Sequence, residues 1–168
     1  MLTPEMHKSQ TNKGVFMNQH NEEILSAKGK VHFVQTNASG EIVKEFEVPN
    51  LVVTTGKNYI AGKMIATDSD VPVHMSHMGI GTGTTSPAAE DTALGTQTAR
   101  VLLSGNLQEN NSITYTATFP AGSGTGAITE AGIFNASTNG TMLARTVFPV
   151  VNKAAGDTIA VTWKITVS

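Results

Sequence analysis

The 168-residue chain contains no cysteine, which excludes disulfide bonds, thiolate zinc sites and cysteine nucleophiles. It is also poor in charge, because only 14% of its residues are charged, whereas about 25% is usual for a globular domain. A surface with so few charges suits a protein that other proteins cover. It equally suits a small β domain with threonine-lined faces.

Lysine and arginine never form a run, and the formal net charge is −2, so the basic footprint of a nucleic-acid-binding protein is missing. No apolar stretch approaches the roughly 18 residues needed to span a bilayer. The polar N-terminal residues lack the apolar centre of a secretory signal. We therefore expect no nucleic acid or membrane partner, and a protein kept in the cytoplasm until it joins an assembly.

The N-terminal segment, residues 1–25, is rich in Asn, Gln, Lys and Glu and shows no hydrophobic period. Such a segment cannot bury enough apolar surface to offset its ordering entropy, so we expect an extended arm that a neighbouring subunit holds. Met17 is an alternative start of the protein, which would make the residues before it an upstream extension. Residues 26–168 are predicted to form a single β-sandwich domain.

Alternation of apolar and polar residues is clearest in the C-terminal half, at residues 112–119 and 158–167. A strict period of two over this length predicts strands with one buried and one polar face, hence an antiparallel sheet. In the last segment the residues expected to face the core are Ile159, Val161, Trp163, Ile165 and Val167. Further strand candidates are residues 99–103, 127–134 and 142–151, with hairpin connections at 109–111 and 137–140.

The N-terminal half of the domain begins with a predicted hairpin. Val31 and Phe33 alternate with polar residues, residues 37–40 form a turn, and residues 42–48 return. Pro49 and Asn50 are then expected to break the chain before a short run at 51–53. With seven to nine short strands in all, the pattern favours an all-β fold, an antiparallel β-sandwich or β-barrel-like domain.

One short helix is predicted to follow this hairpin, and it should be docked on the sheet rather than stable alone. Thr55 is the expected N-cap, and residues 68–70 are expected to end the helix. The apolar stripe, softened by a lysine stem, consists of Tyr59, Ile60, Lys63 and Met64.

Two sequence features bear on metal or phosphate binding, and neither is convincing. His74 and His77 lie three residues apart in a segment that looks extended, which would point them to opposite faces, and no acidic residue is near enough to complete a site. The glycines of residues 79–83 lack the helix and the further glycine of a nucleotide-binding loop, so a strand ending in a glycine turn is favoured.

A third feature bears on nucleophilic catalysis. Residues 121–126 lack the first glycine of a nucleophile elbow and are predicted to form a mobile loop. We expect no metal, no cofactor and no catalytic residues.

Glu130 is the carboxylate that predicts most about the fold, because it lies in an otherwise apolar predicted strand. The only arginines, Arg100 and Arg145, lie in the predicted strands that precede and follow it. We therefore expect a structural ion pair between Glu130 and one or both arginines, inside the sheet or at a subunit contact, because planar guanidinium groups suit a bidentate pair. The alternative is an exposed glutamate on a strand edge.

Several segments of the chain carry a resemblance to small structural proteins of tailed-bacteriophage virions. They are NLVVTTGKNYIA at 50–61, HMGIGTGT at 77–84, ITEAGIFN at 128–135, GTMLARTVF at 140–148 and the terminal residues 152–168. The glutamate-small-glycine-aliphatic-aromatic strand, followed by a turn and a Leu-Ala strand, is also similar to modules of tail-collar and tail-fibre proteins. The resemblance covers over two thirds of the chain and leaves out the N-terminal arm.

Within that class the chain most resembles head-decoration (capsid cement) proteins, since it is a single compact module without the repeats of a fibre shaft. The resemblance implies a non-enzymatic protein on the capsid surface of the virion. Its partners would be the major capsid protein and copies of itself, as a homotrimer. A tail, neck or baseplate module is the first alternative. A carbohydrate-binding adsorption module is the second, although aromatic residues, which would stack on sugars, make up only 5% of the chain.

Overall fold

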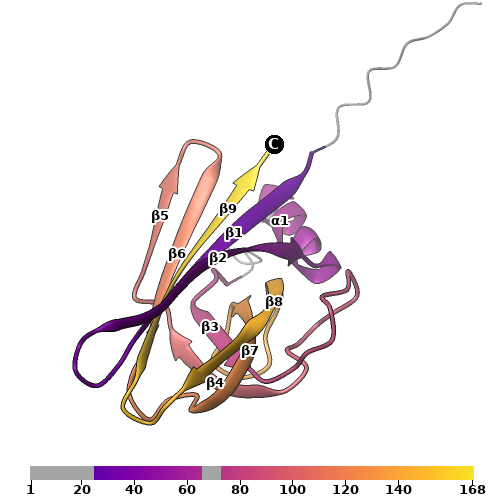
Figure 1. Cartoon of the computed structure of the whole chain (residues 1–168). Coiled ribbons are helices and arrows are strands. Elements are labelled where there is room, and N and C mark those ends of the chain that lie inside the picture. The colour runs from indigo at the N-terminus through magenta and orange to yellow at the C-terminus, as the bar shows by residue number, and fades with distance from the viewer. Residues whose placement is uncertain (1–24, 66–72) are drawn as a thin grey trace, which may run out of the picture.

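A computed structural model of the chain describes residues 25–65 and 73–168, which form nine strands and one helix (Figure 1). The strands are β1 (Ala27–Thr36), β2 (Ile42–Val52), β3 (His77–Gly81), β4 (Gln97–Leu102), β5 (Gly105–Glu109), β6 (Ser112–Phe119), β7 (Gly126–Phe134), β8 (Met142–Lys153) and β9 (Thr158–Val167). The helix, α1, spans Thr54–Ile65. The predicted all-β class is confirmed.

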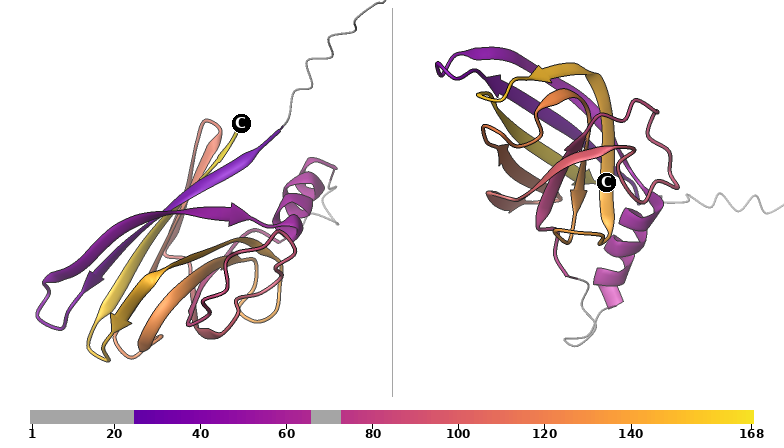
Figure 2. Two further views of the ribbon diagram at one scale, coloured as in Figure 1. Left: turned by 45° about the vertical axis from the view of Figure 1, so that its right-hand side comes forward. Right: turned by 90° about the horizontal axis from the view of Figure 1, so that it is seen from below.

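The nine strands form one antiparallel sheet in the order β4-β3-β7-β8-β2-β1-β9-β6-β5. The sheet curls into a half-barrel, so that its two halves face each other in two layers (Figure 2). Strand β2 belongs to both halves, because most of it pairs with β1 whereas Leu51 and Val52 pair with β8. We refer to the two halves by their central strands, as the β1–β9–β6 half and the β3–β7–β8 half.

The main core lies between these halves, and the predicted alternation places residues in it correctly. Along β9 the side chains of Ile159, Val161, Trp163 and Ile165 are buried while their neighbours point outward. Trp163 is fully buried, as predicted. In β6 the same pattern holds except at the strand start, where Ser112 is buried and Ile113 is 36% exposed.

The predicted hairpin turns are confirmed, and backbone conformation explains their composition. The β5–β6 turn contains Asn110 at φ 52°, and the β7–β8 connection contains Asn139 at φ 52° and Gly140 at φ 74°. Asparagine and glycine are the residues that adopt such left-handed conformations at least cost. The β1–β2 turn likewise contains Gly40 at φ 84°.

The predicted break at Pro49 and Asn50 is wrong, because β2 continues through both residues opposite β1. The Pro49 carbonyl accepts a hydrogen bond from Thr146 Oγ1 (2.8 Å), and Asn50 Oδ1 accepts one from Trp163 Nε1 (3.0 Å). Asn50 fits there because Gly29, its partner on β1, has no side chain. Pro-Asn dipeptides favour turns locally, but here tertiary hydrogen bonds hold this dipeptide in a strand.

The predicted N-cap at Thr55 is also wrong, since α1 begins at Thr54 and Thr55 lies in its first turn. Its hydroxyl donates to the Met142 carbonyl of β8 instead (3.0 Å). Gly56 is the only buried residue of the helix, because its missing side chain allows the backbone to rest on Leu143. Met64 of the predicted stripe is 76% exposed. The predicted helix end at 68–70 and the predicted arm lie outside the described residues, except Leu25.

Candidate functional site

The predicted carboxylate, Glu130, is fully buried on β7 of the β3–β7–β8 half. It points away from the main core, because the pairing register between β7 and β8 shifts between Ile128 and Glu130. Ile128, Ala131 and Ile133 consequently face the main core, whereas Glu130 lies on the opposite, outer face of the sheet. Such a bulge re-aims side chains without ending the strand.

Five hydrogen-bond donors surround the Glu130 carboxylate. Oε1 accepts from the backbone N–H groups of Gly83 (2.9 Å) and Thr96 (2.7 Å). Oε2 accepts from the N–H of Gly95 (2.9 Å) and from Nε (3.1 Å) and Nη2 (2.8 Å) of Arg145. The expected pair with Arg145 is therefore present, and two guanidinium donors share one carboxylate oxygen, a charge-assisted contact.

Arg145 extends this network to a second carboxylate. Its Nη1 donates to Asp91 Oδ2 (2.8 Å), and the same oxygen accepts from the N–H of Ala88 (2.9 Å). The network therefore holds the loop between β3 and β4 at its start, in its middle and at its end. We call Glu130, Arg145 and Asp91 the buried charge cluster.

Gly81 and Gly83, two of the three glycines of residues 79–83, lie against this cluster, a connection that the sequence did not reveal. A Cβ at Gly83 would lie 2.5 Å from Glu130 Oε1, and one at Gly81 would lie 2.6 Å from it. Any larger residue would therefore displace the carboxylate or the loop. Strand β3 does end at Gly81, as the favoured interpretation required, but the segment cradles a side-chain carboxylate.

The β3–β4 loop also covers the outer face with apolar contacts. Leu94 packs there with Val53, Phe134 and Met142 in a small cluster separate from the main core. A Cβ at Gly132 would lie 3.1 Å from a Leu94 methyl group, so the absence of a side chain makes room for the loop. The β3–β7–β8 half is thus buried on both faces.

The electrostatics of the cluster follow from these contacts. Burial by itself raises the pKa of Glu130, but the N–H groups of Thr96, Gly95 and Gly83 and the Arg145 guanidinium outweigh it, so the net pKa is lowered. The pKa of Asp91 is lowered in the same way, since the Ala88 N–H and Arg145 outweigh the effect of burial. Both carboxylates are therefore charged at neutral pH.

Arg100, the other predicted partner, does not contact Glu130. Its Nε and Nη2 donate to Gln97 Oε1 (3.0 and 2.6 Å), and its Nη1 donates to the carbonyls of Ala136 (3.0 Å) and Asn139 (2.9 Å). Its guanidinium also stacks 3.5 Å from the centre of the Phe134 ring. Arg100 fixes the β7–β8 turn, and desolvation lowers its pKa.

Lys153 is a second buried charge, which the sequence did not predict, and it is only 2% exposed. Its Nζ donates to the carbonyls of Pro120 (3.0 Å) and Asp157 (2.6 Å). Asp157 Oδ2 in turn accepts from Gln35 Nε2 (2.7 Å) and the Ala154 N–H (2.9 Å). Desolvation, more than the opposing charge of Asp157, lowers the pKa of Lys153. The spacing of Lys153 and Asp157 across a turn was the only available signal.

His74 and His77, the two histidines that the sequence singled out, both lie in the described part of the chain. His77 begins β3, and its Nδ1 lies 2.8 Å from Ser76 Oγ. Burial, together with the charge of Arg100, lowers the pKa of His77. Across residues 25–65 and 73–168, no group of three His, Asp or Glu side chains is arranged to hold a metal ion.

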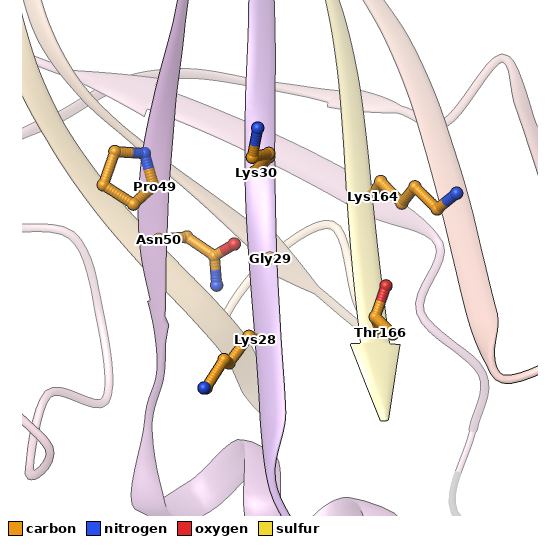
Figure 3. Close-up of a pocket in the computed structure, with 7 residues that line it drawn as sticks. All are labelled: Lys28, Gly29, Lys30, Pro49, Asn50, Lys164 and Thr166. Carbon is orange, nitrogen blue, oxygen red and sulfur yellow. The ribbon is translucent and has the colours of Figure 1, made fainter. Parts of the chain in front are cut away.

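A hollow of about 510 Å³ lies over Gly29, between β2, β1 and β9 (Figure 3). Its walls are the stems of Lys28, Lys30 and Lys164, and Lys30 donates to Glu47 Oε1 (2.7 Å). Asn50 approaches the position that a side chain on Gly29 would occupy, and its Nδ2 is buried with no hydrogen-bond partner among the described residues. The hollow is lined mainly by aliphatic lysine stems.

The buried charge cluster is suited to a structural role. Glu130 has no exposed surface, and five donors already occupy its two oxygens. In this conformation it cannot reach a substrate or exchange a proton with one. Its geometry instead fixes the long β3–β4 loop on the sheet.

No family model matches the chain, and no curated protein and no solved structure matches it. None of the helices in the described part of the chain is long and apolar enough to cross a membrane.

Proposed function

We propose that this protein is a structural component of a tailed-bacteriophage virion, a decoration protein that binds the assembled head and reinforces it. The proposal rests on the resemblance of residues 50–61, 77–84, 128–135 and 140–148 to such proteins. Three of these segments meet in space, because Glu130 accepts hydrogen bonds from the N–H of Gly83 and from Arg145. The resembling motifs thus hold the β3–β4 loop on the sheet, which supports a structural role.

The observation that carries the proposal best is the outer surface of β6 and β9. This surface, which we call the threonine face, consists of Thr114, Thr116, Thr118, Ala160, Thr162, Lys164 and Thr166. Thr116 pairs with Thr162 and Thr118 with Ala160 across the two strands, so short side chains lie in rows. Lys164 is the only charge among the seven residues. A broad face with so few charges costs little to desolvate, which suits contact with another protein.

The proposed partners are the major capsid protein and further copies of this chain, arranged as a homotrimer on the capsid surface. Each contact can be weak, because many copies on one particle bind with multiplied strength when neighbours also touch one another. The N-terminal arm would add interface area, and its ordering cost would be met only on the assembled shell.

Cryo-electron microscopy of purified virions tests this proposal. Density for the half-barrel in many copies across the head, with the threonine face against another protein, is the expected result. Density confined to the neck, baseplate or fibres would instead identify a tail module and would refute the reinforcing role.

A matched pair of variants tests the contact surface. Thr162→Arg places a large charge in the middle of the threonine face, so it should reduce the occupancy of particles at least about tenfold, a loss of about 1.4 kcal/mol. Ser39→Arg places the same charge at the exposed tip of the β1–β2 hairpin and should leave occupancy unchanged. Equal occupancy by both variants would rule out the threonine face as the contact.

A further inference from the structure

The open end of the half-barrel carries an apolar groove along α1. The helix lies at this end beside the start of β1 and the end of β9 (Figures 1 and 2). On one side of α1 is a hollow of about 330 Å³ against β1, and on the other a hollow of about 320 Å³ against β6. Both hollows are lined by Ile60 and Val167, so they adjoin each other, and we refer to the two together as the groove.

The described residues leave this groove uncovered. Leu25 is 66% exposed and Met64 is 76% exposed, although both line its β1 side. Ile113 and Tyr115 line the β6 side. Isolated exposed apolar residues are ordinary, but an apolar groove beside a helix is typical of a binding surface for an apolar segment.

Among the described residues, the charged side chains that line the groove are lysines. Lys28 and Lys57 line one hollow and Lys63 the other, and no described carboxylate lines either hollow. An apolar segment with acidic residues nearby would therefore complement the groove.

Such a segment occurs in this chain, in the residues that precede Leu25. Val15, Phe16 and Met17 are three consecutive apolar residues, and the charged residues from Lys13 to Glu23 are one lysine, Lys13, and two glutamates, Glu22 and Glu23. We propose that Val15–Met17 of a neighbouring copy occupies the groove along α1, with Phe16 as the anchor. This deepens the proposed function and rests on it in one respect, namely that copies of the chain meet.

The geometry at Leu25 favours a neighbouring copy over the same molecule. Ser26 exchanges backbone hydrogen bonds with Ser168, so the start of β1 is held in line with the sheet and itself forms a wall of the groove. To enter its own groove, the chain would have to reverse direction within residues 18–24. That stretch contains no glycine or proline, and only its two asparagines, Asn18 and Asn21, favour such a reversal. A copy that approaches from outside meets no such constraint.

Disulfide trapping tests the proposal on the full chain, which has no cysteine of its own. Asn18→Cys in one preparation and Ala61→Cys in another are mixed at high concentration under mild oxidation, and the mixed disulfide is measured by mass. We expect it to form at least about tenfold faster than the mixed disulfide between Asn18→Cys and Thr162→Cys, because docking raises the local concentration of the thiols. Thr162 is exposed on the threonine face, away from α1.

Three outcomes would overturn the proposal. Equal rates with Ala61→Cys and Thr162→Cys would show that the groove is not selected. An unchanged rate after Phe16→Ser is added to Asn18→Cys would show that Phe16 is not the anchor. Rapid closure within one molecule of an Asn18→Cys/Ala61→Cys double variant in dilute solution would assign the groove to the chain's own arm.

These measurements use purified protein, so they are independent of where the chain lies in a virion. Tail density in the micrographs, combined with selective trapping, would refute the head-decoration function and leave the groove contact standing. Head density without selective trapping would do the reverse.

Discussion

The two halves of the half-barrel solve the same problem, the burial of a sheet face, in different ways. The β1–β9–β6 half buries one face against the core and leaves the threonine face bare. The β3–β7–β8 half is buried on both faces, because the β3–β4 loop lies on its outer side. The first half therefore shows strict alternation in sequence, whereas in β7 seven consecutive residues are buried.

This difference teaches where a polar residue becomes essential. On the bare face, polar side chains are solvated and interchangeable. Under the loop, the backbone N–H groups of Gly83, Gly95 and Thr96 do not pair with the backbone of a neighbouring strand. The Glu130 carboxylate accepts a hydrogen bond from each of them instead. Buried donors must find acceptors, so one carboxylate replaces the hydrogen bonds that a further strand would have supplied.

The largest expected effect comes from removing the charge of Glu130. Glu130→Gln leaves Arg145 buried with only Asp91 as its charged partner, so we expect the free energy of unfolding to fall by about 3–5 kcal/mol. Urea unfolding followed by circular dichroism measures this loss. The control is Glu47→Gln in the exposed pair with Lys30, which should cost less than about 1 kcal/mol. Similar losses for both variants would contradict the contrast between the halves.

Gly81→Ala should have the next largest effect. The added Cβ would lie 2.6 Å from Glu130 Oε1 and would collide with the Thr96 carbonyl, so we expect a loss of about 2 kcal/mol, within the usual range for overpacking. Gly105→Ala on the edge strand β5 is the matched control, because its Cβ would meet only the Thr116 hydroxyl at 3.2 Å. Unfolding in urea compares the two. A smaller loss for Gly81→Ala than for the control would show that the glycine does not hold the loop close.

Acid should affect the β3–β7–β8 half selectively. Because the pKa of folded Glu130 lies below its ordinary value of 4.5, its contribution to stability is complete above that pH. That contribution is lost as the pH falls through the lowered pKa, when folded Glu130 takes up a proton. Asp91 acts in the same direction. We expect the Tm of Glu130→Gln to fall less steeply than that of the wild type as the pH is lowered from about 5 to about 2. Parallel curves would contradict the assignment.

The smallest effect on stability is expected on the threonine face. Thr162→Ala and Thr118→Ala remove exposed hydroxyl groups that make no hydrogen bond in the described part of the chain, so each should change the free energy of unfolding by less than about 0.5 kcal/mol. Thermal unfolding at neutral pH measures this change. A loss comparable to that of Gly81→Ala would show that the face is not an independent, solvated surface.

Some of this was predictable from the sequence because it depends on local periodicity. The strands β6 and β9, the buried Trp163 and the Asn- and Gly-containing turns all follow from period two and turn chemistry, which neighbouring residues encode. The continuation of β2 through Pro49 was not predictable, since its support comes from Thr146, almost a hundred positions away.

The candidate site divides along the same line. That Glu130 would pair with an arginine followed from one carboxylate in an apolar strand and only two arginines in the chain. Glu130 pairs with Arg145 rather than Arg100 because of the register between β7 and β8. Arg145 lies opposite Gly132 in that register, so the Arg145 side chain is diagonally beside Glu130. Lys153 gave no comparable signal, because its partners are backbone carbonyls, which every residue possesses.

The sequence by itself determined the β class and the period-two core of the β1–β9–β6 half, because these depend on the order and polarity of nearby residues. Only the tertiary structure decided that the glycines of β3, the β3–β4 loop and Glu130 form one unit. The physical reason is that a buried N–H group takes whichever acceptor the folded chain brings within 3 Å. For Gly83 and Thr96 that acceptor lies 47 and 34 positions away.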